Sequence, residues 1–420
     1  MAGWAIRVQK KMEMKAMVRN IEFEQARDLM LEYAEPVSIE RVPLEECTGR
    51  ILAQDIVAQE SVPAFDRSPY DGYAFMAADT ACASAANPVT LRVLEEVAAG
   101  DVPKQNVTEG TAIKILTGAP IPQGADAVVM YEKTAFTETE VSLTEPVCSG
   151  DNIVREGEDI LQGELLAEKG SWIDCGIAGT LSSQGEIYPQ VYRKPRIGLI
   201  STGNEVVDSD GEVPEGKIRN TNRYTLAAEV QRNGCEPVYL GQAGDAANEI
   251  AGLIKKGLET CDALLLTGGV SVGDYDLTPE AMEQADVNIL IRGVGMKPGM
   301  ACAYGERDGK TVYGLSGNPA SALTGFYAVV MPVLRKMAGR KDFIPQEIMV
   351  TLADDFSKRS RCMRLLRGRL DLSEGMVKMH ISQKQGNVVI SSAIGCDVLA
   401  IVPAGSGPLR AGTVLKGFLL

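Results

Sequence analysis

The sequence predicts a multidomain protein with mixed α+β parts at the N-terminus, a central α/β domain with a parallel sheet, and a C-terminal β domain. At 420 residues the chain is too long for a single core. Short alternating β segments split by Gly and Pro fill residues 85–144. After Pro195, strand and helix patterns alternate, which is typical of a parallel sheet covered on both faces. From Lys341 onward the pattern returns to short strands.

The N-terminal region begins with a stretch that we expect to be a flexible tail, residues 1–20. It is basic, but it has no apolar segment of signal-peptide length. The next stretch, IEFEQARDLMLEYAEP, has apolar residues at helical spacing. VSIERVPLEECTGRILAQDIVA then has the pattern of short strands around a Thr-Gly turn, and AGTLSSQG is expected to form a short helix.

The central region contains the clearest strand and helix patterns. The expected strands are RIGLIST, EPVYLG, DALLLT and KTVYGLSG. The expected helices are NTNRYTLAAEVQRNG, AANEIAGLIKKGLET and NPASALTGFYAVVMPVLRKMAG. The first of these helices has a polar start and stops at Gly234, as capping rules require.

Composition excludes several classes of protein. A net charge of −14 argues against a nucleic-acid partner, because such proteins carry a basic face. The nine cysteines are scattered and form no CxxC pair, so neither a disulfide framework nor a zinc site is expected. Free thiols fit a cytoplasmic protein best. The apolar runs are shorter than the ~20 residues of a membrane span.

Glycine-rich turns are expected to meet at one edge of the central sheet, since ligands of α/β sheets bind outside the carboxyl ends of the strands. Four segments reach this edge: ISTGNEVV, GQAGD, LLLTGGVSVGDYD and GLSGNPASA. In the last, Gly317 allows a tight turn, Pro319 suits a first helical position, and Ser321 lies beside unpaired N–H groups. A helix start of this kind holds an anion.

Four acids are expected on the same rim, where they would repel a bound phosphate. They are Glu205, Asp245, Asp274 and Asp276. A divalent cation between carboxylate and phosphate removes the conflict, and Mg²⁺ is bound in this way. Lys297 adds a positive charge near the rim.

The remaining motifs leave fewer options for catalysis. The single histidine, His380, makes a Ser-His-Asp relay improbable. No GxxxxGK[ST] loop or GxGxxG turn occurs. Acid–base chemistry would therefore fall to carboxylates or a metal-bound water. DRSPYDGYAF and ILTGAPIPQGADAVVMYE can be read equally as braced turns or as loops that reach into a neighbouring site.

The chain resembles a known family over residues 21–420. The stretches that carry the resemblance are SPYDGYAF, ILTGAPIPQGADAVVMYE, GDNIVREGEDILQGELL, ISTGNEV, IRNTNRYTL, LLLTGGVSVGDYD, MKPGMACAYG and GLSGNPASA, in that order. Together they resemble the MoeA family, the molybdopterin molybdenumtransferases, which includes the gephyrin E domain and the plant Cnx E domain.

The resemblance implies an elongated homodimer of four-part subunits. Residues 21–50 with 150–192 would form a discontinuous domain I, 51–149 a β-rich domain II, 193–340 the α/β molybdopterin-binding domain, and 341–420 a C-terminal β-barrel. The implied reaction takes adenylated molybdopterin and molybdate, needs Mg²⁺ and releases AMP. The site would lie between the α/β domain of one subunit and an N-terminal part of the other. A molybdopterin-adenylating enzyme is the implied partner.

The resemblance also implies roles for individual residues. Positions matching those around substrate and metal are Asp71, Thr117, Glu205, Asp245 and Asp276, the last three as metal ligands. Positions matching the pterin-phosphate loops are Gly268, Gly269, Ser271, Gly317, Asn318, Pro319 and Ser321. Lys297 matches the first lysine of a KPGK motif, and Arg367 matches the oxyanion-site arginine.

The chain departs from the family pattern on the oxyanion side. Met300 stands where the second lysine of KPGK is usual, with Ala301 for a proline, Ser316 for the proline of GLPGNP, and Asn387 for a serine. Charge-assisted hydrogen bonds contribute about 1.5–3 kcal/mol, so losing one could weaken oxyanion binding roughly 10- to 100-fold. A tungstate-inserting paralogue and a non-catalytic pterin-binding scaffold therefore stay as alternatives to molybdate insertion.

Overall fold

The computed structural model describes residues 16–271, 277–373 and 375–420, which fall into two compact units. Unit 1 contains the described residues up to 54, together with 169–174 and 188–420. Unit 2 contains residues 55–168 and 175–187. The finer division into four domains stays a prediction. No helix in the described ranges combines the length and apolarity that a membrane crossing requires.

A seven-stranded sheet forms the centre of unit 1, in the order β1-β17-β19-β20-β16-β12-β15. Its strands are β1 (Val18–Ile21), β12 (Arg196–Thr202), β15 (Glu236–Ala243), β16 (Ala263–Thr267), β17 (Asn288–Val294), β19 (Ala303–Arg307) and β20 (Lys310–Leu315). Strands β20, β16, β12 and β15 are mutually parallel, as predicted. Strand β19 runs antiparallel to both neighbours. It joins β20 through Asp308-Gly309, whose φ angles of 53° and 80° suit a two-residue hairpin turn.

The N-terminal strand corrects one expectation. Residues 18–20, assigned to a flexible tail, belong to β1, which pairs in parallel with β17. Val18 lies opposite Ile291, and Ile21 lies opposite Val294. The two middle residues of this short edge strand, Arg19 and Asn20, are polar, so the hydrophobic pattern does not predict a strand here. The remainder of the expected tail, residues 1–15, lies outside the described residues.

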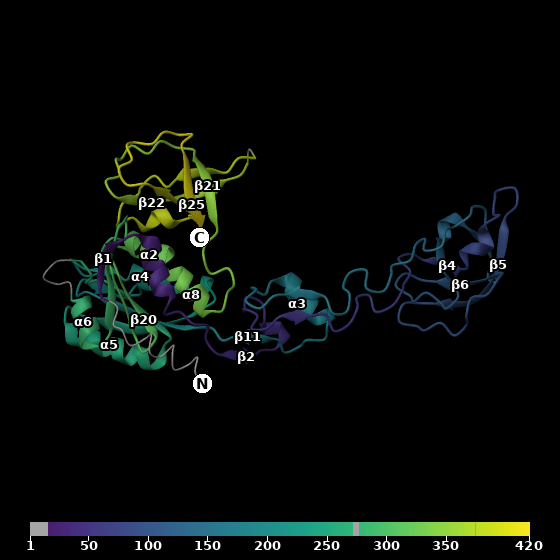
Figure 1. Ribbon diagram of the computed structural model, residues 1–420, viewed down its shortest axis with the longest axis horizontal. Helices are drawn as coiled ribbons and strands as arrows, with labels where there is room; N and C mark the ends of the chain where they lie inside the picture. The colour runs from purple at the N-terminus through teal and green to yellow at the C-terminus, as the bar shows by residue number, and fades with distance from the viewer. Residues whose placement is uncertain (1–15, 272–276, 374) are drawn as a thin grey trace. The chain divides into compact units, whose positions relative to one another are not determined.

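Helices cover both faces of the seven-stranded sheet (Figure 1). They are α2 (Phe23–Leu31), α4 (Thr221–Arg232), α5 (Ala247–Thr260), α6 (Thr278–Gln284), α7 (Pro319–Gly325), the π-helix η4 (Phe326–Val330) and α8 (Met331–Met337). Helices α5 and α6 pack on Leu264 and Leu266, whereas the others share a core with Leu265. Successive residues of a strand point to opposite faces of the sheet. A strand covered by helices on both faces therefore has a continuous run of apolar residues. The helix predicted over residues 318–339 is interrupted by one π turn.

The C-terminal part of unit 1 is a closed barrel, which confirms the fold class. Its strands are β21 (Glu347–Leu352), β22 (Met363–Asp371), β23 (Lys378–Ile381), β24 (Val398–Val402) and β25 (Val414–Leu419), with the 3₁₀ turn η5 (Ile390–Ala393) beside them. The order β22-β23-β21-β25-β24 closes because β22 also pairs with β24. Closure leaves no free sheet edge. The short strand β18 (Met296–Lys297) pairs in parallel with the first two residues of β22 and so connects the barrel to the α/β part.

Unit 2 is built on a six-stranded sheet in the order β7-β4-β6-β5-β9-β8. The strands are β4 (Gly72–Phe75), β5 (Val89–Val97), β6 (Thr111–Ile115), β7 (Ala127–Met130), β8 (Ala135–Phe136) and β9 (Glu140–Leu143). Tyr73 and Phe75 face one core and Ala74 faces the other, as strand alternation requires. Strands β3 (Ile56–Val57) and β10 (Leu165–Ala167) pair with each other, and α3 (Cys175–Ser183) is the predicted short helix.

Smaller elements complete both units. Unit 1 has the pair β2 (Ile39–Arg41) and β11 (Gln190–Tyr192), the pair β13 (Val206–Val207) and β14 (Ile218–Arg219), and the 3₁₀ turn η1 (Leu44–Glu46). Unit 2 has the 3₁₀ turns η2 (Ala77–Thr80) and η3 (Tyr131–Lys133).

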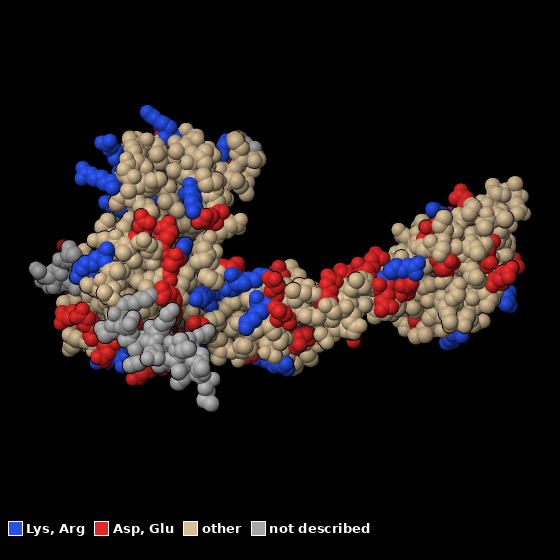
Figure 2. Space-filling view, viewed as in Figure 1, with Lys and Arg blue, Asp and Glu red and all other residues tan. Residues whose placement is uncertain are grey.

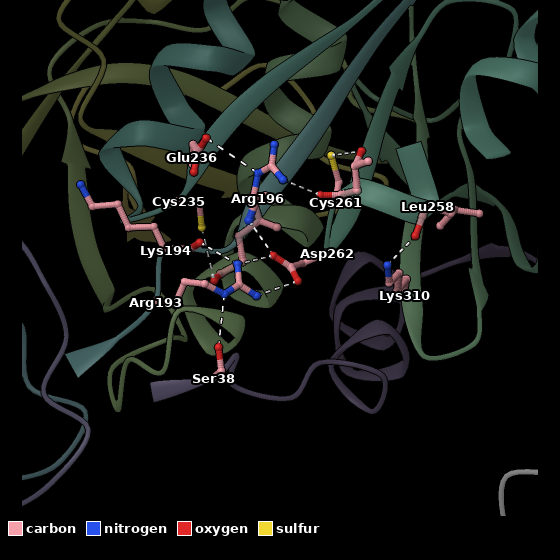
Figure 3. Close-up of polar contacts among 12 residues, drawn as sticks. Ser38, Arg193, Lys194, Arg196, Cys235, Glu236, Leu258, Cys261, Asp262 and Lys310 are labelled. Atoms are coloured by element: carbon pink, nitrogen blue, oxygen red, sulfur yellow. Dashed lines mark hydrogen bonds and ion pairs between the residues drawn. The ribbon is translucent and has the colours of Figure 1, made fainter. Parts of the chain in front are cut away.

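An ion-pair cluster ties the start of β12 to the start of β16 (Figure 3). Both carboxylate oxygens of Asp262 accept hydrogen bonds from the Arg193 guanidinium, at 2.9 and 3.0 Å. One oxygen also accepts the Arg196 backbone N–H at 2.7 Å. Burial alone would raise the pKa of Asp262, but these hydrogen bonds outweigh it, and the pKa lies below its usual value. The cluster therefore stabilises the fold only while Asp262 is ionised.

We expect Asp262→Asn to lower the melting temperature of unit 1 at pH 7 by about 3 °C, because the bidentate pair with Arg193 is lost. The folded pKa is depressed, so the wild-type advantage exists above the unfolded pKa of about 4 and disappears as pH falls through the lower folded value. Calorimetry at pH 7 measures the difference in melting temperature, and calorimetry at pH 3 measures its decrease at low pH. Glu236→Gln is the control, because its contact with Arg196 is 3.8 Å long and exposed. An equal melting temperature for wild type and Asp262→Asn at pH 7 would contradict this role.

Candidate functional site

A cavity of about 820 Å³ lies at the carboxyl ends of β12, β16 and β20. Residues from six separate stretches of unit 1 form its wall. They are Ser201, Thr202, Glu205, Val206, Ile218, Arg219, Asn220, Thr221, Asn222, Thr267, Gly269, Val270, Ser271, Lys297, Pro298, Gly299, Met300, Ala301, Ser316, Gly317, Asn318, Pro319, Ser321, Asn387 and Val388. This is the edge at which the sequence predicts ligand binding, and parallel strands bring these segments together.

The turn after β16 requires glycine at two successive positions. Gly268 and Gly269 have φ angles of 106° and 61°. A Cβ on Gly268 would overlap Thr202 Oγ1 and lie 3.0 Å from the Thr202 carbonyl oxygen. Thr278 fixes the turn by donating its Oγ1–H to Gly268 O at 2.7 Å and its N–H to Gly269 O at 2.9 Å. The backbone around Gly269 is therefore held rigidly against the cavity.

The start of helix α7 forms a second part of the wall. Asn318 precedes the helix, and Pro319 occupies its first turn. The Ser321 N–H is shared between Asn318 O, at 3.0 Å, and Asn387 O, at 3.1 Å. This differs from the expectation of unpaired N–H groups beside Ser321, because a loop of the barrel supplies a carbonyl there. The Ser321 side chain still lines the cavity.

Helix α4 contributes side chains that the sequence analysis did not assign to the site. Asn220 caps the helix by accepting the Arg223 N–H at 3.1 Å. Its Nδ2 donates to Ser201 Oγ at 2.9 Å. Asn222 Nδ2 donates to Gly317 O at 2.9 Å and so holds the turn before α7. The stretch IRNTNRYTL carries these residues, but a polar helix start has the same pattern, so only the fold reveals their place.

The cavity wall contains the cation Lys297 and the thioether Met300, in addition to a second cation, Arg219. Lys297 and Met300 both have exposed side chains. The backbone of Lys297 lies beside Arg364, because β18 pairs in parallel with β22. Met300 is 44% exposed and lines the cavity. The wall thus presents a positive charge next to an apolar surface.

Of the four acids predicted at the rim, the structure places one in the cavity wall. Glu205 lines the cavity, and its carboxylate packs against the backbone of Gly203. Asp245 is exposed beyond the end of β15 and does not line the cavity. Asp274 and Asp276 lie outside the described residues. In the described part of the chain, no three acidic, His or Cys side chains are grouped so that they could hold a metal ion by themselves.

Arg367 lies behind the cavity rather than in its wall. Its side chain is 0% exposed. The guanidinium donates to Ser392 Oγ at 2.7 Å, Gly386 O at 3.2 Å and Thr324 Oγ1 at 3.4 Å. Burial lowers the pKa of Arg367, since no carboxylate accompanies it among these partners. In this geometry Arg367 holds the 386–388 loop in place, and the loop carries Asn387 to the cavity.

In unit 2 the structure brings together two predicted residues that are far apart in sequence. Asp71 Oδ1 accepts the Thr117 N–H and the Thr117 Oγ1–H, both at 2.7 Å. The hydrogen bonds from Thr117 lower the pKa of Asp71, and nearby Lys114 adds to the effect. Both side chains are exposed. Unit 2 therefore presents a carboxylate that is ionised and fixed in orientation.

Comparisons with known proteins identify the family of the chain. Residues 21–185 match the MoeA N-terminal region, domains I and II, and residues 198–336 match a probable molybdopterin binding domain. A molybdopterin molybdenumtransferase of Staphylococcus epidermidis is 35% identical over 397 residues, 94% of each chain. One from Staphylococcus aureus is 36% identical over 374 residues, 88% of each chain.

A crystal structure shows the same fold. The molybdopterin biosynthesis MoeA protein of Pyrococcus horikoshii superposes with a TM-score of 0.83 at 32% identity, covering 96% of this chain and 100% of that one. Sequence identity over nearly the whole chain and a shared fold lead to one conclusion. This chain is a member of the MoeA family.

Proposed function

We propose that this transferase of molybdenum cofactor biosynthesis inserts molybdate into adenylated molybdopterin and releases AMP. The observation that carries the proposal is the cavity wall, which combines the Gly268-Gly269 turn, the start of α7 and Lys297. Backbone N–H groups of a glycine turn and a helix start favour phosphate. The ammonium group of Lys297 would attract the oxyanion. Its relatives from Staphylococcus are named molybdopterin molybdenumtransferases, which supports the proposal.

The chain's own residues position the reactants in this proposal. Asn222 and Thr278 keep the two phosphate-binding turns in place through their bonds to Gly317 and Gly268. The 386–388 loop, held by Arg367, covers one side of the cavity. Fixing both reactants in one cavity lowers the entropic part of the barrier. Attack by water or oxyanion oxygen on the pyrophosphate link would then expel AMP.

Magnesium is proposed as the metal, and the described donors fit it in part. Mg²⁺ is usually held by one or two carboxylates together with substrate phosphate oxygens and water. Glu205 supplies one carboxylate in the cavity wall. Asp245 and Asp276 remain proposed ligands. When bound, the metal would neutralise phosphate charge and polarise the bond to be broken.

The experiment that tests the function follows AMP. The purified protein is incubated with adenylated molybdopterin, Mg²⁺ and either molybdate or tungstate. AMP release that requires molybdate supports the proposal, and faster release with tungstate would assign the other oxyanion. Asp276→Asn should abolish turnover while pterin binding persists. Tight pterin binding by the wild type without AMP release would overturn catalysis and leave the scaffold alternative.

Met300 provides a gain-of-function prediction. Met300→Lys places a second ammonium group next to Lys297 in an exposed position. We expect it to tighten oxyanion binding about tenfold, since one charge-assisted hydrogen bond contributes about 1.5 kcal/mol or more. The KM for molybdate measures this change. Met300→Leu is the matched control and should leave KM unaltered. A KM that does not fall in Met300→Lys would show that the oxyanion binds elsewhere.

We also propose that the protein acts in the cytoplasm as a homodimer, in sequence with a molybdopterin-adenylating enzyme. In this proposal Asp71 and Thr117 of one copy complete the cavity of the other. The hydrogen bonds that orient Asp71 support it, because they prepare an exposed carboxylate for a partner. Mixing two impaired variants, Asp71→Asn and Lys297→Gln, tests the sharing. Heterodimers would contain one intact site, so the mixture would be more active than either variant alone. If each site lies within one copy, the mixture would show only the average activity of the two variants.

A further inference from the structure

We infer that a basic ridge on the C-terminal barrel collects the anionic substrate and guides it into the cavity. The basic ridge consists of Lys358, Arg359, Arg361 and Arg364. The inference rests on the proposed function, because it requires an anionic substrate. It adds an entry route to the site already described.

The ridge carries positive charge that no carboxylate among the described residues compensates. Lys358, Arg359 and Arg361 are exposed, and no carboxylate of the described residues lies within ion-pair distance of them. Elsewhere on the barrel, Arg410 pairs with Asp355 at 2.8 Å and Lys416 pairs with Glu347 at 2.7 Å. Figure 2 shows Lys and Arg side chains along the outer edge of the barrel, with few acidic ones beside them. These cations are therefore free to act on a mobile anion.

The ridge runs directly to the cavity. Arg364 is the register partner of Lys297, which lines the cavity, and Met363 is the partner of Met296. Adjacent strands lie about 4.8 Å apart. Arg361 lies three residues before Arg364, in the bend that precedes β22, so at most roughly 10 Å of chain separates the two residues. This is comparable to the Debye length of about 8 Å at physiological salt, so Arg361 and Arg364 contribute to one local positive field beside Lys297.

The negative charge of the rest of the chain makes a local basic route useful to an anionic ligand. The chain carries a net charge of −14, yet residues 341–420 contain 11 Lys and Arg against 7 Asp and Glu. Unit 2 contains only 6 Lys and Arg against 21 Asp and Glu. A negatively charged ligand is repelled by the molecule as a whole, so a local basic path decides where it arrives. Fields of this kind raise association rates by about 10- to 1,000-fold.

Arg364 also packs against the barrel, so it is not a suitable position for a test of charge alone. Its Nε donates to Ser360 Oγ at 3.3 Å, and its guanidinium lies 5.6 Å from the centre of the Phe356 ring. Replacing it would disturb barrel packing. Arg359 and Arg361 make no such contacts with the described residues, so we expect Arg359→Gln with Arg361→Gln to remove two charges and leave the fold intact. Lys255→Gln with Lys256→Gln, two exposed positions on α5, removes the same charge away from the ridge.

The experiment measures association by stopped-flow fluorescence with two pterins. The anionic probe is 6-hydroxymethylpterin phosphate, and the neutral probe is 6-hydroxymethylpterin. At low salt we expect the ridge variant to bind the phosphate about fivefold more slowly, with an unchanged dissociation rate. The difference should vanish near 0.5 M salt, where screening is complete over a few Å. The α5 variant and the neutral probe should show no change.

Several results would overturn the inference. Equal association rates for wild type and ridge variant would do so, and so would an equal slowing of the neutral probe. A faster dissociation at an unchanged association rate would mean direct contact with the ligand instead of guidance. A lower mass of the ridge variant in sedimentation would assign the ridge to a second copy of the chain. If the wild type binds no phosphorylated pterin, the proposed function itself fails, and the ridge inference fails with it.

Discussion

Gly268→Ala is expected to abolish binding of the phosphorylated pterin. At φ 106° an alanine costs about 1–3 kcal/mol of backbone strain, and its methyl group would overlap Thr202. The turn can relieve the overlap only by moving away from Thr202, which displaces Gly269 from the cavity wall. We expect affinity for 6-hydroxymethylpterin phosphate to fall more than 100-fold, measured by fluorescence titration.

Gly252→Ala is the matched control for this change. Gly252 lies inside helix α5, where an added Cβ meets nothing within 4 Å. Alanine there should raise helix stability by up to about 1 kcal/mol and leave pterin affinity unaltered. Wild-type affinity in Gly268→Ala would show that the turn after β16 does not hold the phosphate.

Lys297→Gln is expected to reduce kcat/KM for molybdate roughly 10- to 100-fold. The described cavity wall contains two cations, Lys297 and Arg219, and the Arg219 guanidinium already donates to Ser209 O at 3.3 Å and Gly211 O at 3.2 Å. Lys297 lines the cavity together with uncharged Met300, and we assign the oxyanion to it. Loss of one charge-assisted hydrogen bond costs about 1.5–3 kcal/mol. Glutamine keeps the length and polarity of the side chain, so the effect isolates the charge. Steady-state AMP release at varied molybdate concentration measures it.

Binding of a neutral pterin shows whether Lys297→Gln changes only the charge of the cavity or also its structure. Affinity of Lys297→Gln for neutral 6-hydroxymethylpterin should equal that of the wild type. Lys255→Gln, on the surface of α5, should change neither quantity. If Lys297→Gln keeps its full kcat/KM, the oxyanion is held by other groups and the assignment of this wall is wrong.

The central sheet and its glycine turn can be predicted from local patterns. Leu264, Leu265 and Leu266 form a strand buried on both faces, and two glycines follow it directly. Helices α4 and α5 were also predictable from local signals: α4 has the Asn220 cap and a glycine stop, and α5 has apolar residues at helical spacing. The site edge then follows from the general rule for parallel strands.

Contacts that depend on long-range closure are not visible in the sequence. The pairing of β22 with β24 closes the barrel, and it brings the 386–388 loop to the start of α7. No local pattern indicates that Asn387 O accepts the Ser321 N–H. Arg367 illustrates the same limit: a family position suggests a ligand contact, whereas the fold buries its guanidinium behind the loop.

Short elements form the other part that sequence patterns missed. Strand β1 has four residues, and its middle pair is polar, so only its pairing with β17 identifies it. Helix α6 has seven residues and follows the glycine turn closely. Its Thr278 nevertheless fixes Gly268 and Gly269, which makes it part of the site's support.

The most direct measurement is a crystal structure of this protein with 6-hydroxymethylpterin phosphate. The account predicts that the phosphate lies within hydrogen-bond distance of the turn at Gly269 or of the start of α7, with the ring in the cavity at the ends of β12, β16 and β20. A ligand bound at any other surface, with this cavity occupied only by water, would contradict it.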